Sequence, residues 1–317
     1  MKASYLISYG RPDSLQYGEL PEPVIKPGTL FVRIKAVSVN PVDWKIKQGL
    51  LKIIKGSKFP MVIGSDFAGV VEQVAPGIKD FVPGDRVYGA ISAFSKQQGA
   101  LSELALVETK YARKIPYFMS FEQAASLPIA ALTALNGLRR TMTGAGVKVL
   151  VNGATGGVGH FAVQMAKARG AHVTATCSSR NVSLAKELGA DRIYNYSGEN
   201  TIPDGTRFDA IMDAWGMMAY SEIHRLLKPE GIYASPLYMP WTVFAATYVR
   251  LRYGRRMTSS NMRTHPEDYA QLEALIESGK LKPFIESTFP LEKAAEAFEK
   301  AEFGKPRGKL IIKVGNE

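Results

Sequence analysis

Short hydrophobic runs, some continuous and some alternating with polar residues, recur through the first third of the chain. They occupy 31–39, 67–74 and 85–91, and turns rich in glycine and proline separate them. Many short strands at regular spacing with such turns are typical of a β-sandwich or barrel. The sequence therefore predicts a β-rich region from Met1 to about Ile115.

From about Ser120 the pattern changes to predicted strands that alternate with helices, one of them over 221–231. Such alternation indicates an α/β fold whose parallel sheet is covered by helices on both faces. Two amphipathic helices follow, with Gly279 and Gly304 near their ends, and a last strand is predicted at 308–314. The strands of the parallel sheet are predicted at 147–152, 171–177, 208–214 and 231–237.

Composition limits the architecture and the chemistry. At 317 residues the chain is long enough for two domains. No hydrophobic run reaches the roughly 18 residues that span a bilayer, and no signal peptide is apparent, so we expect a cytoplasmic protein. Cys177 is the sole cysteine, which excludes an internal disulfide, and the four histidines lack metal-ligand spacing, so no metal site is expected.

The formal net charge of +11 arises from 40 basic and 29 acidic residues. An excess of this size raises the affinity for polyanions in general. Composition alone leaves three partners open, namely nucleic acid, an anionic membrane surface and the phosphates of a dinucleotide.

The sharpest local motif is a glycine-rich turn at 152–159, which joins a predicted buried strand to a predicted helix. Phosphate must approach the backbone closely there, and a helix amino terminus offers free N–H groups and a favourable dipole. The context of strand, turn and helix favours a dinucleotide site over an empty turn. The predicted cofactor-binding residues of this turn are Gly153, Ala154, Gly156, Gly157 and Val158.

The end of the second strand of the predicted parallel sheet indicates which nucleotide binds. No acidic residue occurs between His172 and Lys186, where NAD-binding proteins usually hold the ribose with a carboxylate. Ser178, Ser179 and Arg180 instead donate hydrogen bonds that suit a 2′-phosphate. NADPH is therefore predicted, the alternative being that Arg180 is a solvated residue at the next helix. Tyr196 is expected either to flank the adenosine or to lie on the surface.

Five motifs in order give the chain a family resemblance that covers nearly its whole length. The chain resembles the zinc-free quinone oxidoreductase branch of the medium-chain dehydrogenases/reductases, in particular the chloroplast-envelope quinone oxidoreductase homologues. The motifs are VSVNPVDWKIKQG (37–49), IGSDFAGVVEQVAPGIKDFVPGDRVYG (63–89), AASLPIAALTALNGL (124–138), NGATGGVGHFAVQMAK (152–167) and RGKLIIKV (307–314).

The resemblance implies two domains. A GroES-like β domain would comprise 1–118 and 284–317, and a doubly wound Rossmann-type NADPH-binding domain would comprise 119–283. Substrate and nicotinamide would meet in the cleft between them. The family also implies a homodimer built edge to edge from the nucleotide-domain sheets, with 255–262 near that edge.

The resemblance implies site residues as well. Asn40 and Lys45 would lie near the nicotinamide and act in catalysis, with Lys45 holding the ribose or polarising the acceptor, unless Lys45 is an ordinary exposed lysine. Further cofactor contacts would come from Thr133, Ser235, Leu237 and Lys309. The zinc branch carries cysteine and His-Glu where this chain has Asn40 and Ser65-Asp66. Asp43 and Asp66 are expected to bridge loops rather than to contact ligand.

The implied reaction is zinc-independent hydride transfer from NADPH to a small-molecule quinone or another activated carbonyl or enone. An alternative is reduction of lipid-derived alkenals or enones, with quinones incidental. From another class, a non-catalytic NADPH-sensing or RNA-binding protein remains open, although no RNA-binding motif occurs and the charges are dispersed. The aromatic and basic segment 236–256 predicts either a helix over the substrate cleft or a peripheral membrane contact.

Overall fold

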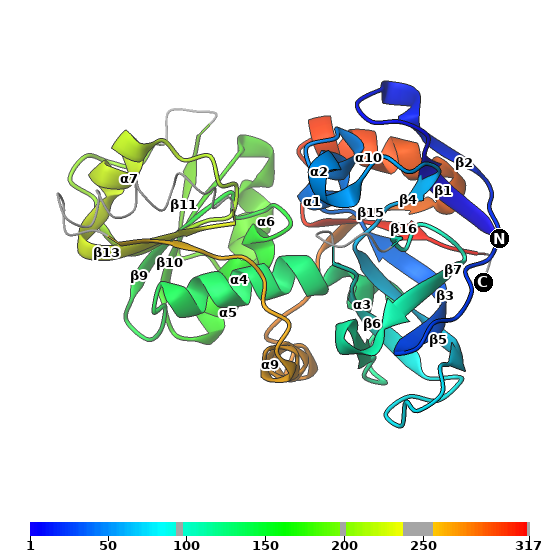
Figure 1. Ribbon diagram of the computed structural model, residues 1–317. Coiled ribbons are helices and arrows are strands. Elements are labelled where there is room, and N and C mark those ends of the chain that lie inside the picture. The colour runs from blue at the N-terminus through cyan, green and yellow to red at the C-terminus, as the bar shows by residue number, and fades with distance from the viewer. Residues whose placement is uncertain (93–97, 197–200, 237–255, 316–317) are drawn as a thin grey trace. The chain divides into compact units, whose positions relative to one another are not determined.

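The computed structural model describes residues 1–92, 98–196, 201–236 and 256–315 (Figure 1). The chain divides into two compact units, the first comprising Met1–Ile129 and Ile285–Glu317 and the second Ala130–Phe284. Helix α3 (Phe121–Ser126) belongs to the first unit because it packs against strands of that unit's main sheet. The segment just after residue 118 therefore clusters with the β-rich unit, and the domain limits expected from the sequence, 1–118 with 284–317 and 119–283, stay a prediction.

The first unit is built on two sheets. The larger sheet has seven strands. Neighbouring strands pair antiparallel, except that β15 and β16, which lie next to each other at one edge, run parallel. In order it contains β15 (Ile285–Pro290), β16 (Lys309–Lys313), β3 (Thr29–Ser38), β5 (Asp66–Val74), β6 (Arg86–Ala90) and β8 (Ala112–Lys114), and β7 (Leu104–Glu108) also pairs with β3. The smaller sheet contains β2 (Leu15–Glu19), β1 (Lys2–Leu6) and β4 (Met61–Val62).

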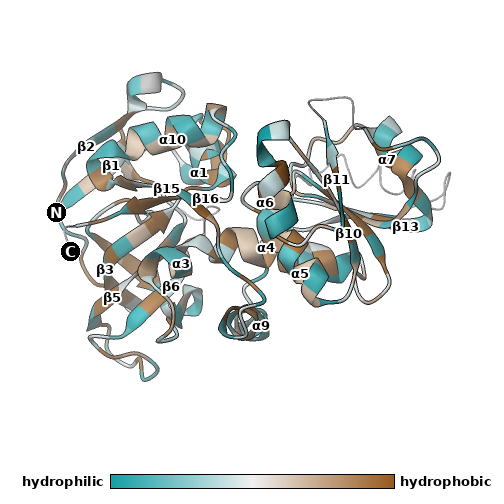
Figure 2. Ribbon diagram, turned by 180° about the vertical axis from the view of Figure 1, so that it is seen from behind, coloured by the Kyte–Doolittle hydropathy of each residue, from teal (hydrophilic) through white to brown (hydrophobic). Residues whose placement is uncertain are grey.

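One continuous hydrophobic core holds the first unit together. Side chains of β3, such as Val32 and Ile34, are fully buried and belong to the same cluster as Phe67 of β5 and Phe298 of α10 (Ala294–Phe303). The side of α10 seen in Figure 2 is mostly hydrophilic. The helix therefore covers the core with one apolar face and presents a polar face outward. Two short helices, α1 (Pro41–Lys47) and α2 (Lys52–Lys55), follow β3.

The second unit contains the predicted parallel sheet, which the structure confirms. Its six strands are all parallel, in the order β11 (Arg192–Asn195), β10 (His172–Cys177), β9 (Lys148–Asn152), β12 (Phe208–Asp213), β13 (Leu227–Ser235) and β14 (Arg256–Ser259). Strands β10, β9 and β12 are almost wholly buried, as expected when helices cover both faces of a sheet.

Helices cover this sheet on its two faces. In Figure 1, α5 (Gly159–Ala168) and α7 (Tyr220–Leu226) lie on opposite sides of the sheet. The other α-helices among the described residues of this unit are α4 (Pro128–Arg140, which begins in the first unit), α6 (Val182–Glu187) and α9 (Pro266–Glu277). Within the part of the chain that the structure describes, no helix has the length and apolar character to cross a membrane.

The prediction of a helix over 221–231 is wrong at its carboxyl end. Helix α7 stops at Leu226, and β13 begins at Leu227, which pairs with Phe208 of the neighbouring strand. Pro229 has no amide hydrogen for a helical bond, and its ring disfavours the helix interior. Tertiary pairing therefore overrides the local helical pattern in this segment.

Candidate active site

The glycine turn lies at the carboxyl end of β9, between that strand and α5. Strand β9 has β10 on one side and β12 on the other, so the chain reverses its direction of winding across the sheet at this strand. Ligands of open parallel sheets bind at such a switch point, where a dinucleotide lies across the strand ends. The predicted phosphate turn therefore stands where the fold places a dinucleotide.

Two glycines show why the turn needs residues without a side chain. Gly153 has a φ of +73°, in the left-handed region that favours glycine. A Cβ on Gly159 would lie 2.1 Å from the carbonyl oxygen of Gly153, so the helix could not start so close to the strand. Gly156 meets only one backbone oxygen, at 3.5 Å, which leaves space on its open side for a phosphate to approach.

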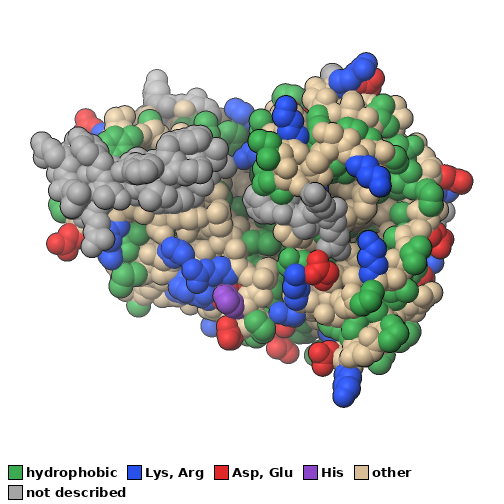
Figure 3. All heavy atoms as spheres, in the orientation of Figure 1, with side chains coloured by type: hydrophobic (Ala, Val, Ile, Leu, Met, Phe, Trp, Pro, Cys, Tyr) green, Lys and Arg blue, Asp and Glu red, His purple; other side chains and the backbone are tan. Residues whose placement is uncertain are grey.

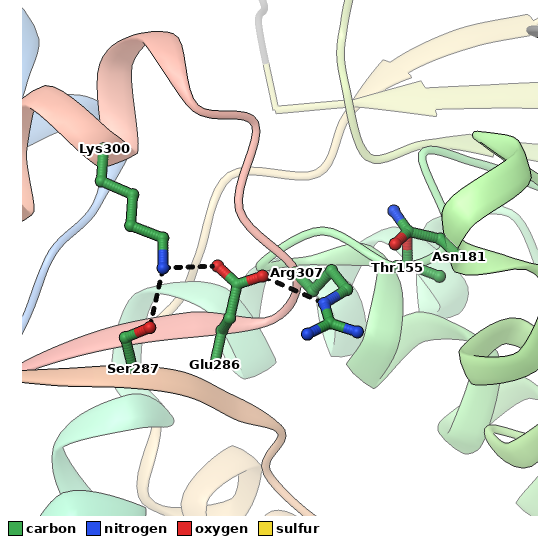
Figure 4. Close-up of polar contacts among 6 residues, drawn as sticks. All are labelled: Thr155, Asn181, Glu286, Ser287, Lys300 and Arg307. Atoms are coloured by element: carbon green, nitrogen blue, oxygen red, sulfur yellow. Dashed lines mark hydrogen bonds and ion pairs between the residues drawn. The ribbon is translucent and has the colours of Figure 1, made fainter.

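The end of β10 lies beside this turn. Ser178 is half-buried, while Ser179 and Arg180 are exposed on a short 3-10 turn that leads into α6. The buried side chain of Asn181 donates a hydrogen bond to the Thr155 hydroxyl at 3.1 Å, and Figure 4 shows these two residues side by side. The structure thus brings the predicted phosphate turn and the predicted 2′-phosphate residues together.

The other predicted cofactor residues of this unit lie at varied depths. Tyr196 follows β11 and is 62% exposed, Ser235 is buried at the end of β13, and Thr133 is buried within α4. Leu237 lies outside the described residues, as does nearly all of the segment 236–256. Cys177 is buried, and burial raises the pKa of its thiol, which agrees with a packing residue.

Hydrogen-bonded polar side chains join the ends of four strands at the glycine turn, an arrangement that the sequence did not predict. The fully buried carboxylate of Asp213 accepts hydrogen bonds from Asn152 Nδ2 (2.8 Å) and from the Tyr233 hydroxyl (2.8 Å). Asn152 Oδ1 in turn accepts from the Thr176 hydroxyl at 2.6 Å. Burial, together with the Asp213 carboxylate, raises the pKa of Tyr233. Asp213, an acidic residue near the end of the predicted strand 208–214, was the signal available in the sequence.

The first unit holds a second polar cluster, fully enclosed between α1, β5 and β16. The Lys309 ammonium donates to Asn40 Oδ1 at 2.7 Å, and Asn40 Nδ2 donates to Asp66 Oδ2 at 2.9 Å. Asp43 accepts from the Asn40 backbone N–H at 2.9 Å and from the Ser65 hydroxyl at 2.7 Å. These five side chains are at most 3% exposed, so their hydrogen bonds are made to protein groups rather than to bulk solvent.

Burial dominates the electrostatics of this cluster. It raises the pKa of Asp43 to about 6, against hydrogen bonds from Ser65 and Asn40 that lower it. Burial likewise raises the pKa of Asp66 and lowers the pKa of Lys309, and the attraction between the two opposes both shifts. Asp66 also accepts from the Ile129 backbone N–H, so both carboxylates tie loops together, as expected from the sequence.

Lys45 lies apart from the enclosed cluster. It is half-buried on α1, and its Nζ stands 5.5 Å from the centre of the Trp44 ring. Burial lowers the pKa of this ammonium. A partly desolvated cation of this kind is a stronger hydrogen-bond donor than one in bulk water, which suits polarisation of a carbonyl oxygen.

An ion cluster fixes the strand that carries Lys309. Glu286 of β15 pairs with Lys300 of α10 at 3.2 Å and with Arg307 at 3.0 Å (Figure 4). Lys300 also donates to the Ser287 hydroxyl at 2.7 Å. Because Arg307 lies two residues before Lys309, these contacts set the start of β16 and hence the depth of the buried ammonium.

Comparisons with known proteins agree with this architecture. The model of the alcohol dehydrogenase GroES-like domain matches residues 26–117, and that of zinc-binding dehydrogenase matches residues 188–312. A chloroplast envelope quinone oxidoreductase homolog of Arabidopsis thaliana is 34% identical, covering 98% of each chain. A chloroplastic NADPH-dependent alkenal/one oxidoreductase of Arabidopsis thaliana is 35% identical, covering 98% of this chain and 79% of its own. The quinone oxidoreductase from Coxiella burnetii superimposes with a TM-score of 0.91 at 31% identity, covering 99% of each chain.

The chain therefore belongs to the medium-chain dehydrogenase/reductase family. Within that family it is similar to quinone oxidoreductases, and the predicted combination of a GroES-like domain with a Rossmann-type domain is confirmed.

The residues at the zinc positions implied by the resemblance do not fit a zinc ion. Asn40 offers an amide whose oxygen already accepts from the Lys309 ammonium, and that cation would repel a second one. Zinc prefers thiolate, imidazole and carboxylate donors, and Asp66 is the sole such group of the three positions. Among the described residues no group of three or more such side chains is placed to hold a metal.

Proposed function

We propose that this protein is a zinc-independent oxidoreductase that uses NADPH to reduce a quinone or another activated carbonyl or enone. The observation that carries the proposal is the glycine turn at the switch point of a parallel sheet, with an acid-free strand end beside it. The curated relatives support the reaction class, since they are named as a quinone oxidoreductase homolog and an NADPH-dependent alkenal/one oxidoreductase.

The residues of the turn would hold the pyrophosphate through backbone N–H groups, and Arg180 with Ser178 and Ser179 would hold the 2′-phosphate. Bound NADPH supplies the hydride. Thr133, Tyr196, Ser235 and Leu237 complete the proposed cofactor contacts. Lys309, which the resemblance also assigns to the cofactor site, is enclosed and would act there indirectly, by fixing Asn40 through their buried hydrogen bond.

Lys45 and Asn40 are the proposed catalytic residues. The negative charge that develops on the acceptor oxygen needs a donor or a cation nearby. Lys45 supplies a partly desolvated ammonium for this purpose. Asn40 is enclosed, and its amide is occupied by Lys309 and Asp66, so its proposed contribution is to position the start of α1, the helix that carries Lys45.

Reduction of alkenals or enones is a second candidate, because the relative named for that activity is 35% identical to this chain. Hydride attack at the β-carbon of an enone and at a quinone requires the same donor and the same polarised oxygen, so one site serves both. RNA binding is less favoured. On the face drawn in Figure 3, Lys and Arg side chains lie in several separate places with acidic residues among them, rather than in a basic stripe.

Two further features belong to the proposal. Strand β14 is the outer strand of the described six-stranded sheet, and a homodimer formed by pairing this edge would appear at twice the monomer mass in light scattering. The cytoplasmic location stays a prediction, since the two curated relatives are named as chloroplast proteins.

The decisive test is oxidation of NADPH and NADH, measured at 340 nm, with a panel of quinones and alkenals. We expect turnover with NADPH, and we expect Arg180→Glu to lower the preference for NADPH over NADH by about 10- to 100-fold, through the loss of charged hydrogen bonds. Lys186→Glu makes the same charge change on the exposed face of α6 and serves as the control. Binding of NADPH without turnover of any acceptor would replace the reductase by a sensing role, and an unchanged preference in Arg180→Glu would refute the phosphate assignment.

A further inference from the structure

The segment 44–65 of the first unit, which contains α2, is both basic and apolar. It has five lysines and no acidic residue, although an aspartate flanks it at each end. Within it Ile53 is 94% exposed, Leu50 66% and Ile54 37%, whereas large aliphatic side chains are usually buried. Exposed apolar side chains that lie this close together mark an interaction surface. These three residues and the exposed Lys52 and Lys58 are called the α2 patch.

The core of the unit holds this segment in place. Leu51 and Phe59 are partly buried and pack against the hydrophobic core. The Tyr9 hydroxyl donates to the Gly56 carbonyl, and the Tyr9 ring meets the Phe59 ring edge-on, with the ring centres 5.1 Å apart. Because the segment is anchored on its core side, its backbone loses little freedom when the α2 patch binds a partner.

The charge at this surface is positive. Asp43 and Asp66, the acids at the two ends of the segment, are fully buried, whereas Lys52 and Lys58 are exposed. In Figure 3, hydrophobic and basic side chains lie next to each other over the region that α1 and α2 occupy in Figure 1. The exposed side chains of the segment 44–65 are thus aliphatic, cationic or neutral.

This combination is complementary to the surface of an anionic lipid bilayer. Aliphatic side chains gain free energy at the boundary between headgroups and acyl chains, and lysines are attracted to anionic headgroups. The apolar stem of a lysine lets its ammonium reach the phosphates while a neighbouring side chain inserts. A single-stranded nucleic acid would instead require exposed aromatic side chains for stacking, and the aromatic residues of this segment, Trp44 and Phe59, are partly buried.

We propose that the α2 patch is a peripheral membrane contact, in which Leu50 and Ile53 enter the interface of an anionic bilayer while Lys52 and Lys58 bind its phosphate headgroups. The contact is reversible, because only a few side chains supply it. It does not depend on the proposed function, but it suits that function, since apolar quinones and lipid-derived enones dissolve in bilayers.

Sedimentation of the full chain with lipid vesicles tests this contact. We expect binding to vesicles made of equal parts of phosphatidylcholine and phosphatidylglycerol, and at least about tenfold weaker binding to phosphatidylcholine alone or at high salt. Ile53→Ser lowers the partition coefficient about tenfold, because the exposed isoleucine no longer enters the interface. Lys52→Glu lowers it by about tenfold or more, since repulsion replaces an attraction to the headgroups.

Two residues elsewhere in the first unit provide matched controls. Val24 is 79% exposed and precedes β3, and the exposed Lys79 follows β5. Because β3 and β5 pair antiparallel, both residues lie beyond the strand ends opposite to the end that leads into α1. Val24→Ser and Lys79→Glu therefore leave vesicle binding within about twofold of the wild type. Ile53 is almost wholly exposed, so Ile53→Ser leaves the midpoint of urea unfolding unchanged, which separates lost binding from lost folding.

The inference is overturned if the wild-type chain does not bind the vesicles that contain phosphatidylglycerol. It is also overturned if Ile53→Ser and Lys52→Glu bind these vesicles as well as Val24→Ser and Lys79→Glu do. Light scattering adds a third outcome, since an oligomer that dissociates in Ile53→Ser would show that a second copy of the chain covers the patch. NADPH binding in calorimetry tests the proposed function separately and has no bearing on these results.

Discussion

The buried Lys309 ammonium is the part of the structure whose removal has the most predictable cost. In Lys309→Met, the side chain keeps a similar length and remains apolar, so the cavity stays filled. The change removes the hydrogen bond to Asn40 Oδ1 and leaves the carboxylates of Asp43 and Asp66 without their cation. The first unit should therefore lose stability, and the loss should depend on the charge of those carboxylates.

Two quantities set the size of the effect. Removing one partner of a buried ionic cluster costs about 3–5 kcal/mol when the remaining charge is uncompensated. Burial raises the pKa of Asp43 to about 6 and raises the pKa of Asp66 as well, so both groups take up protons as the pH falls. At pH 8 we therefore expect the full cost, and at pH 5 a cost that is smaller by about 2 kcal/mol, because neutral carboxyls need no cation.

Urea unfolding at the two pH values measures this difference. A background with Trp215→Phe and Trp241→Phe leaves Trp44 as the only indole, and Trp44 lies on α1 next to the cluster. Fluorescence then follows the first unit by itself. Asp66→Asn in the same chain keeps an oxygen that accepts from Asn40 and removes one unpaired charge, so the double variant should recover part of the loss.

Lys313→Met is the matched control on the same strand. Lys313 pairs with Glu122 at 3.4 Å, and both side chains are partly exposed, so its removal should cost less than about 1 kcal/mol with little change between the two pH values. The reasoning is refuted if Lys309→Met costs less than about 1 kcal/mol at pH 8, or if it costs the same at pH 5.

Two other changes test the turn and the titration of the cluster. In Gly159→Ala, the new Cβ would lie 2.1 Å from a backbone oxygen of the turn, so NADPH affinity in calorimetry should fall at least about tenfold, whereas Gly144→Ala, which meets nothing within 4 Å, should have no effect. Because the pKa of Asp43 is raised to about 6, its contribution to stability is complete below about pH 4 and is lost as the pH rises through 6. Asp43→Asn should remove this loss, which amounts to about 2 kcal/mol between pH 4.5 and pH 7.5 and is measured by urea unfolding at those two values; an unaltered pH profile would contradict the assignment.

Local patterns were sufficient for much of this fold. The strands of the parallel sheet are continuous apolar runs between turns, and a strand buried on both faces requires that pattern wherever it lies. The glycine turn is equally local, because Gly153 and Gly159 lie within one strand–helix connection. The acid-free end of β10 could be read from the same segment, and the structure places it beside the turn.

Tertiary structure alone brought together the groups that are far apart in the chain. Lys309 and Asn40 form one hydrogen bond although 269 positions separate them, and no periodicity links a lysine in the last strand to an asparagine after the third. The same holds for Asp213 and Tyr233, whose partnership depends on the order of the strands. The sequence by itself determined the elements and the phosphate turn, because those follow from contacts between neighbours along the chain. The pKa shifts of the buried cluster were decided by packing, which buries these groups and sets distances between residues that the sequence does not relate.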